Sequence, residues 1–254
     1  MTNILLSGAN GKMGQAVTRV AAENDSVKIV AGYDINTAQN ADFPVYDKLS
    51  DIKNIKDIDA IIDFSHPAMF SSLLDFAKTN NIPVVFCTTG LSEEQLSSMK
   101  AASKSTPVFF SANMSIGVNL LIVLVTKAAN ILQDNFDIEI IEKHHNQKLD
   151  APSGTALAIA DAIADTVSYN AEYVYDRHSV RKKRDKAEIG IHAVRGGTIV
   201  GEHDVIFAGN DEVIEIKHSA ASKEVFAVGA VKAAVFMKGK PAGMYAMKDL
   251  IEQS

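Results

Sequence analysis

Short apolar runs alternate with helical patterns along the first 115 residues. The runs at 60–64 and 84–87 are continuously apolar, which is typical of strands covered on both faces. The whole pattern predicts strands at 3–7, 27–33, 60–64, 84–87 and 108–110, with helices at 12–23, at 68–79 and from Ser92 onward. Ser92 and Gln95 have the spacing of a capping box. Regular alternation of strands and helices needs crossover connections, so this region predicts a parallel sheet.

The pattern changes after residue 114. It predicts a long helix at 116–132, a strand at 137–142, a helix at 156–167, β-rich runs at 188–194, 198–207 and 212–218, and a closing helix at 222–237. Gly196-Gly197 and Gly209-Asn210-Asp211 mark turns between the β-rich runs. Consecutive strands with tight turns favour antiparallel pairing, so we expect a second domain of a different type.

A glycine-rich turn, Gly8 to Gly14, follows the first predicted strand and opens the first helix. Glycine permits a sharp turn and lets the backbone approach a pyrophosphate, which the unpaired N–H groups of the helix start can bind. An acidic residue lies 20 positions after Gly14, where a carboxylate can bind an adenosine ribose. The alternative is a turn that only packs. We expect cofactor contacts from Gly8, Ala9, Asn10, Gly11, Lys12, Met13 and Asp34.

Two further segments lie at the carboxyl ends of predicted strands, where doubly wound sheets bind ligands. We expect them to flank the nicotinamide half of a dinucleotide, although the first could be an ordinary turn. Their cofactor-binding candidates are Cys87, Thr88 and Thr89, and Ser111, Ala112, Asn113 and Met114.

The composition narrows the class of protein. Of 254 residues, 47% are hydrophobic and 22% charged, as in ordinary globular proteins, and the net charge of −6 argues against a nucleic-acid partner. The lone Cys87 cannot form an internal disulfide, which favours a reducing compartment. The run at 116–125 is too short to span a membrane, and no basic targeting segment is visible. We therefore expect a cytoplasmic, soluble protein.

A basic run at 177–186 holds six lysines and arginines in an otherwise acidic chain. One interpretation is a solvated loop. The other is a flexible lid that attracts an anionic ligand.

The densest group of reactive side chains lies at 139–156. His144 and His145 are adjacent, Lys148 follows, and Ser153, Gly154 and Thr155 resemble an anion-binding helix start. The lysine and histidines could donate protons or bind a carboxylate. Two alternatives are a structural histidine pair and a zinc site. Zinc is disfavoured because adjacent histidines do not share a helix face and no thiol lies nearby, so we expect no metal.

Residues 139–156 match E-[IV]-x-E-x-H-x-x-x-K-x-D-x-P-S-G-T-A, the signature of the 4-hydroxy-tetrahydrodipicolinate (dihydrodipicolinate) reductase family, at every fixed position. The chain also resembles this family at Asp63–Ser65, at 88–90, at 111–115, at Arg195-Gly196-Gly197 with 200–203, and at 243–250. The resemblance implies an α/β fold: a Rossmann-type parallel-sheet domain (1–115 and 222–254) that binds the dinucleotide, with an inserted α+β mixed-sheet domain (116–221) for substrate binding and oligomerisation.

The resemblance also implies a reaction and its residues. Hydroxy-tetrahydrodipicolinate, a dicarboxylate, would lose water and be reduced by NAD(P)H in diaminopimelate and lysine synthesis. His144 would be proton donor and acceptor and Lys148 proton donor, while His145, Gly154 and Thr155 would bind substrate. The family is usually a homotetramer. Two rivals remain, a Rossmann dehydrogenase acting on another acid and a non-catalytic redox sensor.

The cofactor preference can be predicted from the ribose-binding position. Ile35 follows Asp34, so the arginine that some relatives use to pair with the 2′-phosphate of NADPH is missing. A carboxylate accepts hydrogen bonds from a free 2′-hydroxyl and repels a phosphate, and Lys12 offsets this only in part. We expect both cofactors to work, with NADH preferred.

Overall fold

The computed structural model describes residues 1–39 and 41–253. The chain divides into two compact units, one formed by residues 1–116 and 224–254 and the other by residues 117–223. No helix among the described residues is long and apolar enough to cross a membrane.

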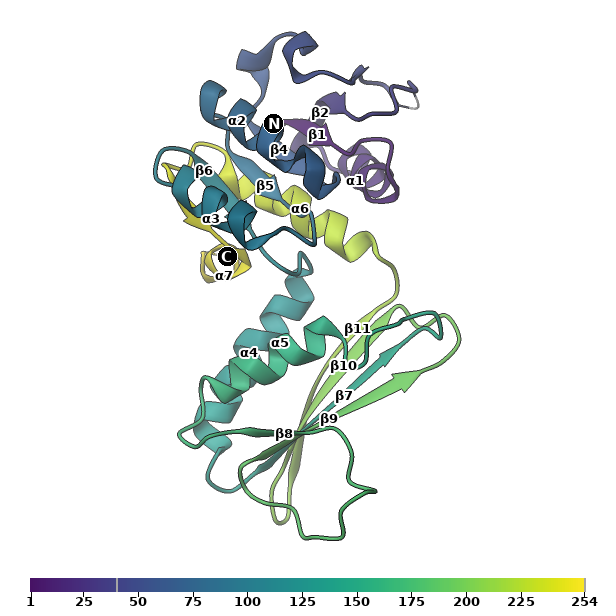
Figure 1. Cartoon of the computed structure of the whole chain (residues 1–254), viewed down its shortest axis with the longest axis vertical. Coiled ribbons are helices and arrows are strands. Elements are labelled where there is room, and N and C mark those ends of the chain that lie inside the picture. The colour runs from purple at the N-terminus through teal and green to yellow at the C-terminus, as the bar shows by residue number, and fades with distance from the viewer. Residues whose placement is uncertain (40, 254) are drawn as a thin grey trace. The chain divides into compact units, whose positions relative to one another are not determined.

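The first unit is built on a parallel sheet of seven described strands (Figure 1). The order across the sheet is β12-β6-β5-β4-β1-β2-β3, and each described pairing is parallel. The strands are β1 (Thr2–Ser7), β2 (Val27–Tyr33), β3 (Val45–Tyr46), β4 (Ala60–Asp63), β5 (Val84–Phe86), β6 (Pro107–Phe110) and β12 (Gly243–Tyr245). The order reverses between β1 and β4, and this places a ligand site at their carboxyl ends.

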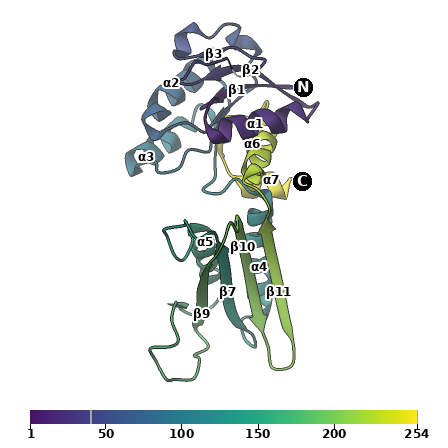
Figure 2. The same ribbon diagram turned by 90° about the vertical axis from the view of Figure 1, so that its right-hand side faces the viewer.

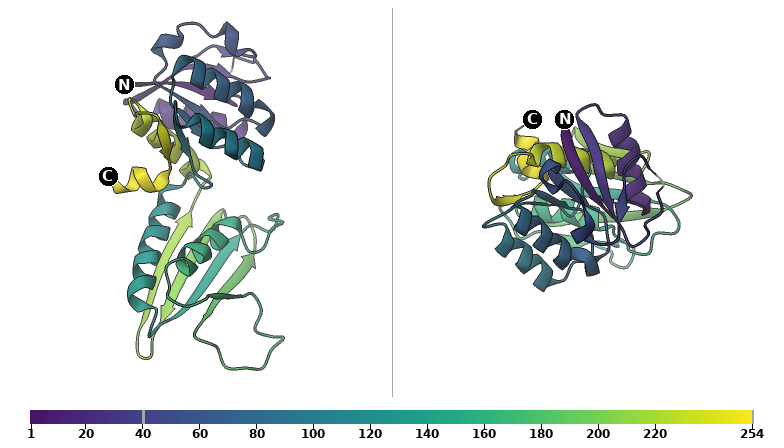
Figure 3. Two further views of the ribbon diagram at one scale, coloured as in Figure 1. Left: turned by 60° about the vertical axis from the view of Figure 1, so that its left-hand side comes forward. Right: turned by 90° about the horizontal axis from the view of Figure 1, so that it is seen from above.

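Helices cover both faces of this sheet, as Figures 1 and 3 show. One face packs against α1 (Lys12–Ala22) and α6 (Glu224–Met237), and the other against α2 (Phe70–Asn80) and α3 (Glu93–Ala102). The capping box at the start of α3 is present: the Ser92 hydroxyl accepts from the Gln95 amide and the Gln95 side chain accepts from the Ser92 amide. Short 3₁₀ turns lie at Leu49–Asp51, Ile55–Asp57 and Pro67–Met69, and α7 (Met247–Glu252) follows β12.

The second unit is a mixed sheet with two helices on one face, α4 (Ile116–Leu132) and α5 (Gly154–Ala164) (Figure 2). The strand order is β11-β10-β7-β9-β8. The strands are β7 (Asp137–His144), β8 (Glu172–Val174), β9 (Glu188–Arg195), β10 (Gly201–Ala208) and β11 (Val213–Ala220). β10 is antiparallel to both β7 and β11, whereas β9 is parallel to β7 and β8.

The sequence pattern was wrong about one neighbour in this sheet. The runs that become β9 and β10 were expected to pair through a tight glycine turn, but β7 lies between them. Residues 196–200 instead pass over the end of β7, where the Gly196 amide donates to the His144 carbonyl and the Asn146 amide donates to the Gly197 carbonyl. The short strands β3, β8 and β12 were not predicted, because two or three residues carry no recognisable period.

Strand β7 presents two chemically different faces. Ile138, Ile140, Glu142 and His144 are buried, while the residues between them are partly exposed. The two isoleucines belong to the core beneath α4 and α5. Successive side chains of a strand point to opposite faces, so Glu142 and His144 share the helix-covered face.

Candidate active site

The residues of the predicted reactive cluster meet in the second unit, where β7 ends and α5 begins. Ser153 is the N-cap of α5, and its hydroxyl accepts from the Ala156 amide at 3.2 Å. Gly154 and Thr155 are therefore the first two residues of the helix, where backbone N–H groups face outward, and the Gly154 amide hydrogen-bonds to the Asp150 carboxylate. A carboxylate is favoured at such a helix start by these donors and by the helix dipole.

Glu142 is a fully buried carboxylate that connects three groups of this site. Its Oε2 lies 2.6 Å from Nδ1 of His144 and 2.7 Å from one terminal nitrogen of Arg195. Its Oε1 accepts from the other terminal nitrogen of Arg195 at 2.7 Å and from the Ser153 amide at 2.9 Å. Burial alone would raise the pKa of Glu142, but the hydrogen bonds from Arg195, His144 and Ser153 outweigh it and hold that pKa below its ordinary value.

Lys148 lies beside an acid in the loop between β7 and α5. Its Nζ is 2.8 Å from Oδ1 of Asp150, and this hydrogen bond lowers the pKa of the Asp150 carboxyl. Arg195 also donates to the Asp150 carbonyl at 2.6 Å. The loop is thus bonded to β9 through Arg195, and within itself through the pair of Lys148 and Asp150.

A second histidine is buried against His144. The ring centroids of His144 and His203 are 5.3 Å apart in an edge-to-face arrangement, and Nε2 of His203 is 3.2 Å from the Ser153 hydroxyl. Burial, followed by repulsion from His144, lowers the pKa of His203 to about 4. His203 is therefore neutral at neutral pH and adds no charge beside His144.

Sequence reasoning assigned no role to Glu142, Asp150, Arg195 or His203, although all four lie in the quoted motifs. One signal was available: Glu142 and His144 are two positions apart, and a strand that continues beyond the predicted end at 142 puts them on one face. Arg195 lies on β9 and His203 on β10, the two strands that flank β7, so strand order and register were needed to place them.

The glycine turn of the first unit lines a pocket of about 430 Å³. Gly8 has φ +76°, and a Cβ there would lie 2.7 Å from the Phe64 carbonyl oxygen. A Cβ on Gly14 would lie 2.1 Å from the Gly8 carbonyl oxygen, so both positions need glycine. Gly11, the N-cap of α1, makes no side-chain capping bond. The helix start can therefore take an anion, and the residues fit a dinucleotide.

Asp34 lines this pocket, and its carboxylate hydrogen-bonds to the glycine turn. Its Oδ2 accepts from the Asn10 amide and its Oδ1 from the Asn36 amide, both at 2.9 Å. Each oxygen keeps lone-pair capacity for a ribose hydroxyl. Ile35 is exposed and also lines the pocket, while Lys12 is exposed on the first turn of α1.

The cofactor-binding candidates at the carboxyl ends of β5 and β6 fall into buried and accessible groups. Cys87 and Met114 belong to the core, so their side chains are not available to a ligand. Burial, followed by repulsion from Asp63, raises the pKa of the Cys87 thiol. Thr88 is buried and donates to Asp63 Oδ2 at 2.6 Å. The accessible candidates are Thr89, Ser111, Ala112 and Asn113.

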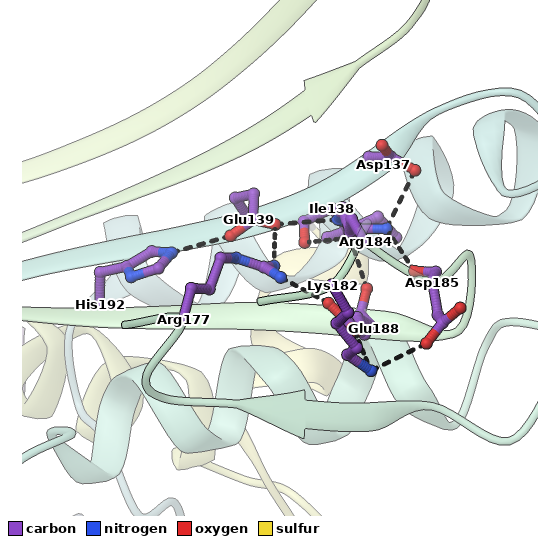
Figure 4. Close-up of polar contacts among 9 residues, drawn as sticks. All are labelled: Asp137, Ile138, Glu139, Arg177, Lys182, Arg184, Asp185, Glu188 and His192. Carbon is purple, nitrogen blue, oxygen red and sulfur yellow. Dashed lines mark hydrogen bonds and ion pairs between the residues drawn. The ribbon is translucent and has the colours of Figure 1, made fainter. Parts of the chain in front are cut away.

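Most basic residues of the run at 177–186 are paired with carboxylates of the second unit. Four of its six basic residues form ion pairs with carboxylates on neighbouring strands and in the run itself. Figure 4 shows three of them, Arg177, Lys182 and Arg184. Arg184 is held most closely, with 17% of its side chain exposed and bonds to Asp137, Glu139 and three carbonyls. Among the described residues, only Arg181 and Lys183 of the run form no ion pair.

No metal-binding group of three or more histidine, cysteine or acidic residues occurs among the described residues. His144 and His145 point into different surroundings, as expected for neighbours at the end of a strand: His144 is buried and His145 half-buried.

Comparisons with known proteins cover both units. Residues 2–114 match the family described as dihydrodipicolinate reductase, N-terminus, and residues 117–251 match its C-terminus. The chain is 54% identical over 253 residues to the 4-hydroxy-tetrahydrodipicolinate reductase of Caldanaerobacter subterraneus, covering 100% of this chain and 99% of that one. It is 47% identical over 247 residues to the enzyme of that name from Staphylococcus aureus, covering 97% and 99%.

The fold is shared with a solved structure described as dipicolinate-bound dihydrodipicolinate reductase from Paenisporosarcina. That likeness has a TM-score of 0.82 and 24% identity, and covers 97% of each chain. Both halves of the sequence match the same family, and the two relatives above align along nearly their whole length. The chain therefore belongs to the dihydrodipicolinate reductase family.

Proposed function

We propose that this protein reduces 4-hydroxy-tetrahydrodipicolinate to tetrahydrodipicolinate with loss of water, using NADH or NADPH, as a step of diaminopimelate and lysine synthesis. The observation that carries the proposal is the cluster at the start of α5, where His144, Lys148 and an anion-binding helix start lie together in a chain of this family. The dipicolinate of the Paenisporosarcina structure is a planar dicarboxylate, which suits such a helix start.

In the first unit, the glycine turn and Asp34 would hold the pyridine nucleotide. The backbone N–H groups at the start of α1 bind the pyrophosphate and the Asp34 carboxylate binds the ribose. When bound, the nucleotide supplies a hydride to the conjugated imine of the substrate. NADH is the preferred form in this proposal, because the residue after Asp34 is Ile35 and not an arginine.

In the second unit, the chain would bind the dicarboxylate and supply the proton. One substrate carboxylate accepts hydrogen bonds from the N–H groups of Gly154 and Thr155 and from the Thr155 hydroxyl, with His145 beside it. Hydride addition places electron density on the ring nitrogen and its conjugated carbon, so a proton must follow. Lys148 donates that proton, and His144 exchanges protons as the hydroxyl leaves as water.

A steady-state assay with enzymatically generated substrate tests this proposal by the loss of NADH absorbance. Turnover that needs both substrate and NADH supports it. Turnover only with another acid would favour the rival dehydrogenase, and nucleotide binding without turnover would favour the redox sensor. Lys148 argues against a sensor, which needs no proton donor.

A homotetramer in the cytoplasm completes the proposal. The second unit has a sheet face without a covering helix, where Ile141 and Ile206 lie among charged side chains. Such a face can be covered by a second copy of the chain. Sedimentation equilibrium would give a mass four times the 27.3 kDa chain if the proposal is right.

A further inference from the structure

We propose that Glu142, clamped by Arg195, is a positioning residue that fixes the tautomer of His144 and anchors it to the start of α5. The inference rests on the proposed function only for the role of His144 in proton exchange. The geometry of the Glu142 site is independent of that role.

The hydrogen bonds of Glu142 decide which nitrogen of His144 carries the proton. An ionised carboxylate only accepts hydrogen bonds, so Nδ1 of His144, 2.6 Å from Oε2, must be the donor. In the neutral ring the proton is then on Nδ1 and Nε2 keeps its lone pair. Nε2 faces Gly201, where a Cβ would lie only 3.1 Å away, so glycine leaves room beside it.

The carboxylate is kept ionised by Arg195. Two parallel bonds of 2.7 Å join the guanidinium to both oxygens of Glu142. This bidentate pairing is the strongest geometry for the two groups and fixes the plane of the carboxylate. The clamp therefore sets the direction from which Oε2 meets the imidazole.

Other charged and titratable groups surround the ring from each neighbouring element. Arg195 comes from β9, His203 from β10, and Lys148 and Asp150 from the loop before α5, while His218 of β11 lies opposite His203. His203 is neutral near pH 7, and Lys148 is paired with Asp150. Glu142 is the carboxylate in direct contact with the His144 ring.

The same carboxylate also holds the anion-binding turn. Oε1 of Glu142 accepts from the Ser153 amide, and Ser153 caps α5. One side chain thereby sets the position of the proton-exchanging ring and of the N–H groups that face the substrate carboxylate. A shift of either would change the distance between the proton-exchanging ring and the N–H groups that face the substrate carboxylate.

The opposite face of β7 offers a matched control. Glu139 also bonds a histidine, with Nε2 of His192 2.8 Å from its Oε2, and also pairs with arginines, Arg177 and Arg184 (Figure 4). It lies on the face of the strand away from α5. Replacing it removes the same charge and the same kinds of bond without touching His144.

Glu142→Gln provides the test because glutamine has a single acceptor oxygen. With that oxygen in the Oε1 position, the bonds from Ser153 and from one terminal nitrogen of Arg195 survive, the second Arg195 bond is lost, and the amide NH₂ faces Nδ1 of His144. A donor there requires an unprotonated Nδ1, so the proton moves to Nε2. Nitrogen-15 spectra of histidine-labelled, ligand-free protein identify the protonated nitrogen of His144 without any assay of activity.

We expect Glu142→Gln to move the proton from Nδ1 to Nε2 and to lower kcat about 100-fold, the scale of positioned acid–base catalysis. KM for the nucleotide should change less than about twofold, and Glu139→Gln should leave the His144 spectrum and kcat unchanged. Glu142→Asp keeps an acceptor and a charge, so it should keep the proton on Nδ1.

Several results would overturn the inference. A Glu142→Gln protein whose His144 keeps the proton on Nδ1, or whose kcat stays within about twofold of wild type, contradicts it. If Glu142→Gln does not fold, a Glu142→Asp protein with the proton on Nε2 would contradict it equally. Failure of the proposed function looks different: the wild type would then lack reductase activity while the tautomer result stands.

Discussion

Lys148 and Asp150 form an ion pair in which Nζ lies 2.8 Å from Oδ1. The two residues are separated by one position in the loop between β7 and α5, so the pair holds the ammonium close to the first turn of the helix. Asp150 is largely exposed, and a substrate carboxylate can compete with it for Lys148. The pair therefore holds the lysine beside the helix start before substrate arrives.

Lys148→Ala should lower kcat by ~10²–10⁴-fold, the usual range for loss of a general acid, with nucleotide binding nearly unchanged. Lys143→Ala is the matched control, since Lys143 pairs with Glu202 on the other face of β7. Steady-state kinetics and nucleotide titration measure both effects. Near-normal turnover of the first variant would assign the donor role to His144 alone.

Thr155→Val removes a hydroxyl from the helix start while keeping the shape of the side chain. Loss of a hydrogen bond to a charged group costs roughly 1.5–3 kcal/mol, so KM for the substrate should rise about 10- to 100-fold. Thr166→Val, just beyond the other end of α5, should leave KM unchanged. An unaltered KM in Thr155→Val would mean that this turn is structural.

Asp34→Asn tests the cofactor preference. The wild type should favour NADH, by ~10-fold in kcat/KM, which needs about 1.4 kcal/mol. Asparagine keeps one acceptor for the Asn10 amide but removes the charge, so it should narrow the difference between NADH and NADPH. Lys12→Ala should harm NADPH more than NADH. A wild type that clearly prefers NADPH would contradict this interpretation of Asp34 and Ile35.

Arg184→Gln should destabilise the second unit without affecting kcat. The arginine joins Asp137, Glu139 and three backbone carbonyls from a position that is 17% exposed. Breaking such a network costs about 2–3 kcal/mol in the free energy of unfolding. Urea unfolding measures the loss, and Arg181→Gln on the same segment should cost less than about 0.5 kcal/mol. Equal stabilities of the two variants would contradict the role given to the network.

His203 should lower the free energy of unfolding in mild acid. Its pKa is about 4 in the folded protein and ordinarily 6.5, so the unfolded chain binds more protons between these pH values. The free energy of unfolding should be highest above pH 6.5 and fall toward pH 4, by up to about 3 kcal/mol. In His203→Asn this slope should flatten, whereas His178→Asn, in the exposed basic run, should keep it. Urea unfolding at several pH values gives the comparison.

Glu188 should cause a second loss of stability in acid, which begins at lower pH. Hydrogen bonds from Lys182 and Arg177 lower the pKa of Glu188 to about 2, from an ordinary value of 4.5. Stability from this carboxylate is present above pH 4.5 and is lost as pH falls toward 2. Glu188→Gln should therefore be less stable than wild type at pH 7 and show a smaller further loss below pH 4.5. An unchanged slope there would contradict the assignment.

Local sequence pattern was sufficient for much of the fold and part of the site. The helix at 116–132 and the strand at 27–33 were predicted with the bounds that the structure shows, because each is long and strongly periodic. His144, Lys148 and Thr155 come together because they are close in sequence, joined by a strand end and a helix start.

The rest depends on contacts between distant segments. Arg195 reaches Glu142 because β9 lies parallel to β7 with His144 opposite Arg195, and no local pattern specifies that register. The same absence of long-range information led to the wrong pairing of β9 with β10. It also hides the ion-pair partners of the basic run, since Glu139 precedes Arg184 by 45 residues.

The two-faced character of β7 limits which changes of chain length the protein can accept. A one-residue insertion within Ile138–Lys143 would turn every later side chain to the opposite face, moving His144 away from α5 and exposing Glu142. A two-residue insertion keeps the faces but moves the later residues by about 7 Å along the strand. Among the active clones of a random insertion library, we therefore expect no insertions within this strand. We expect the turn at Gly209–Asp211 to accept added residues.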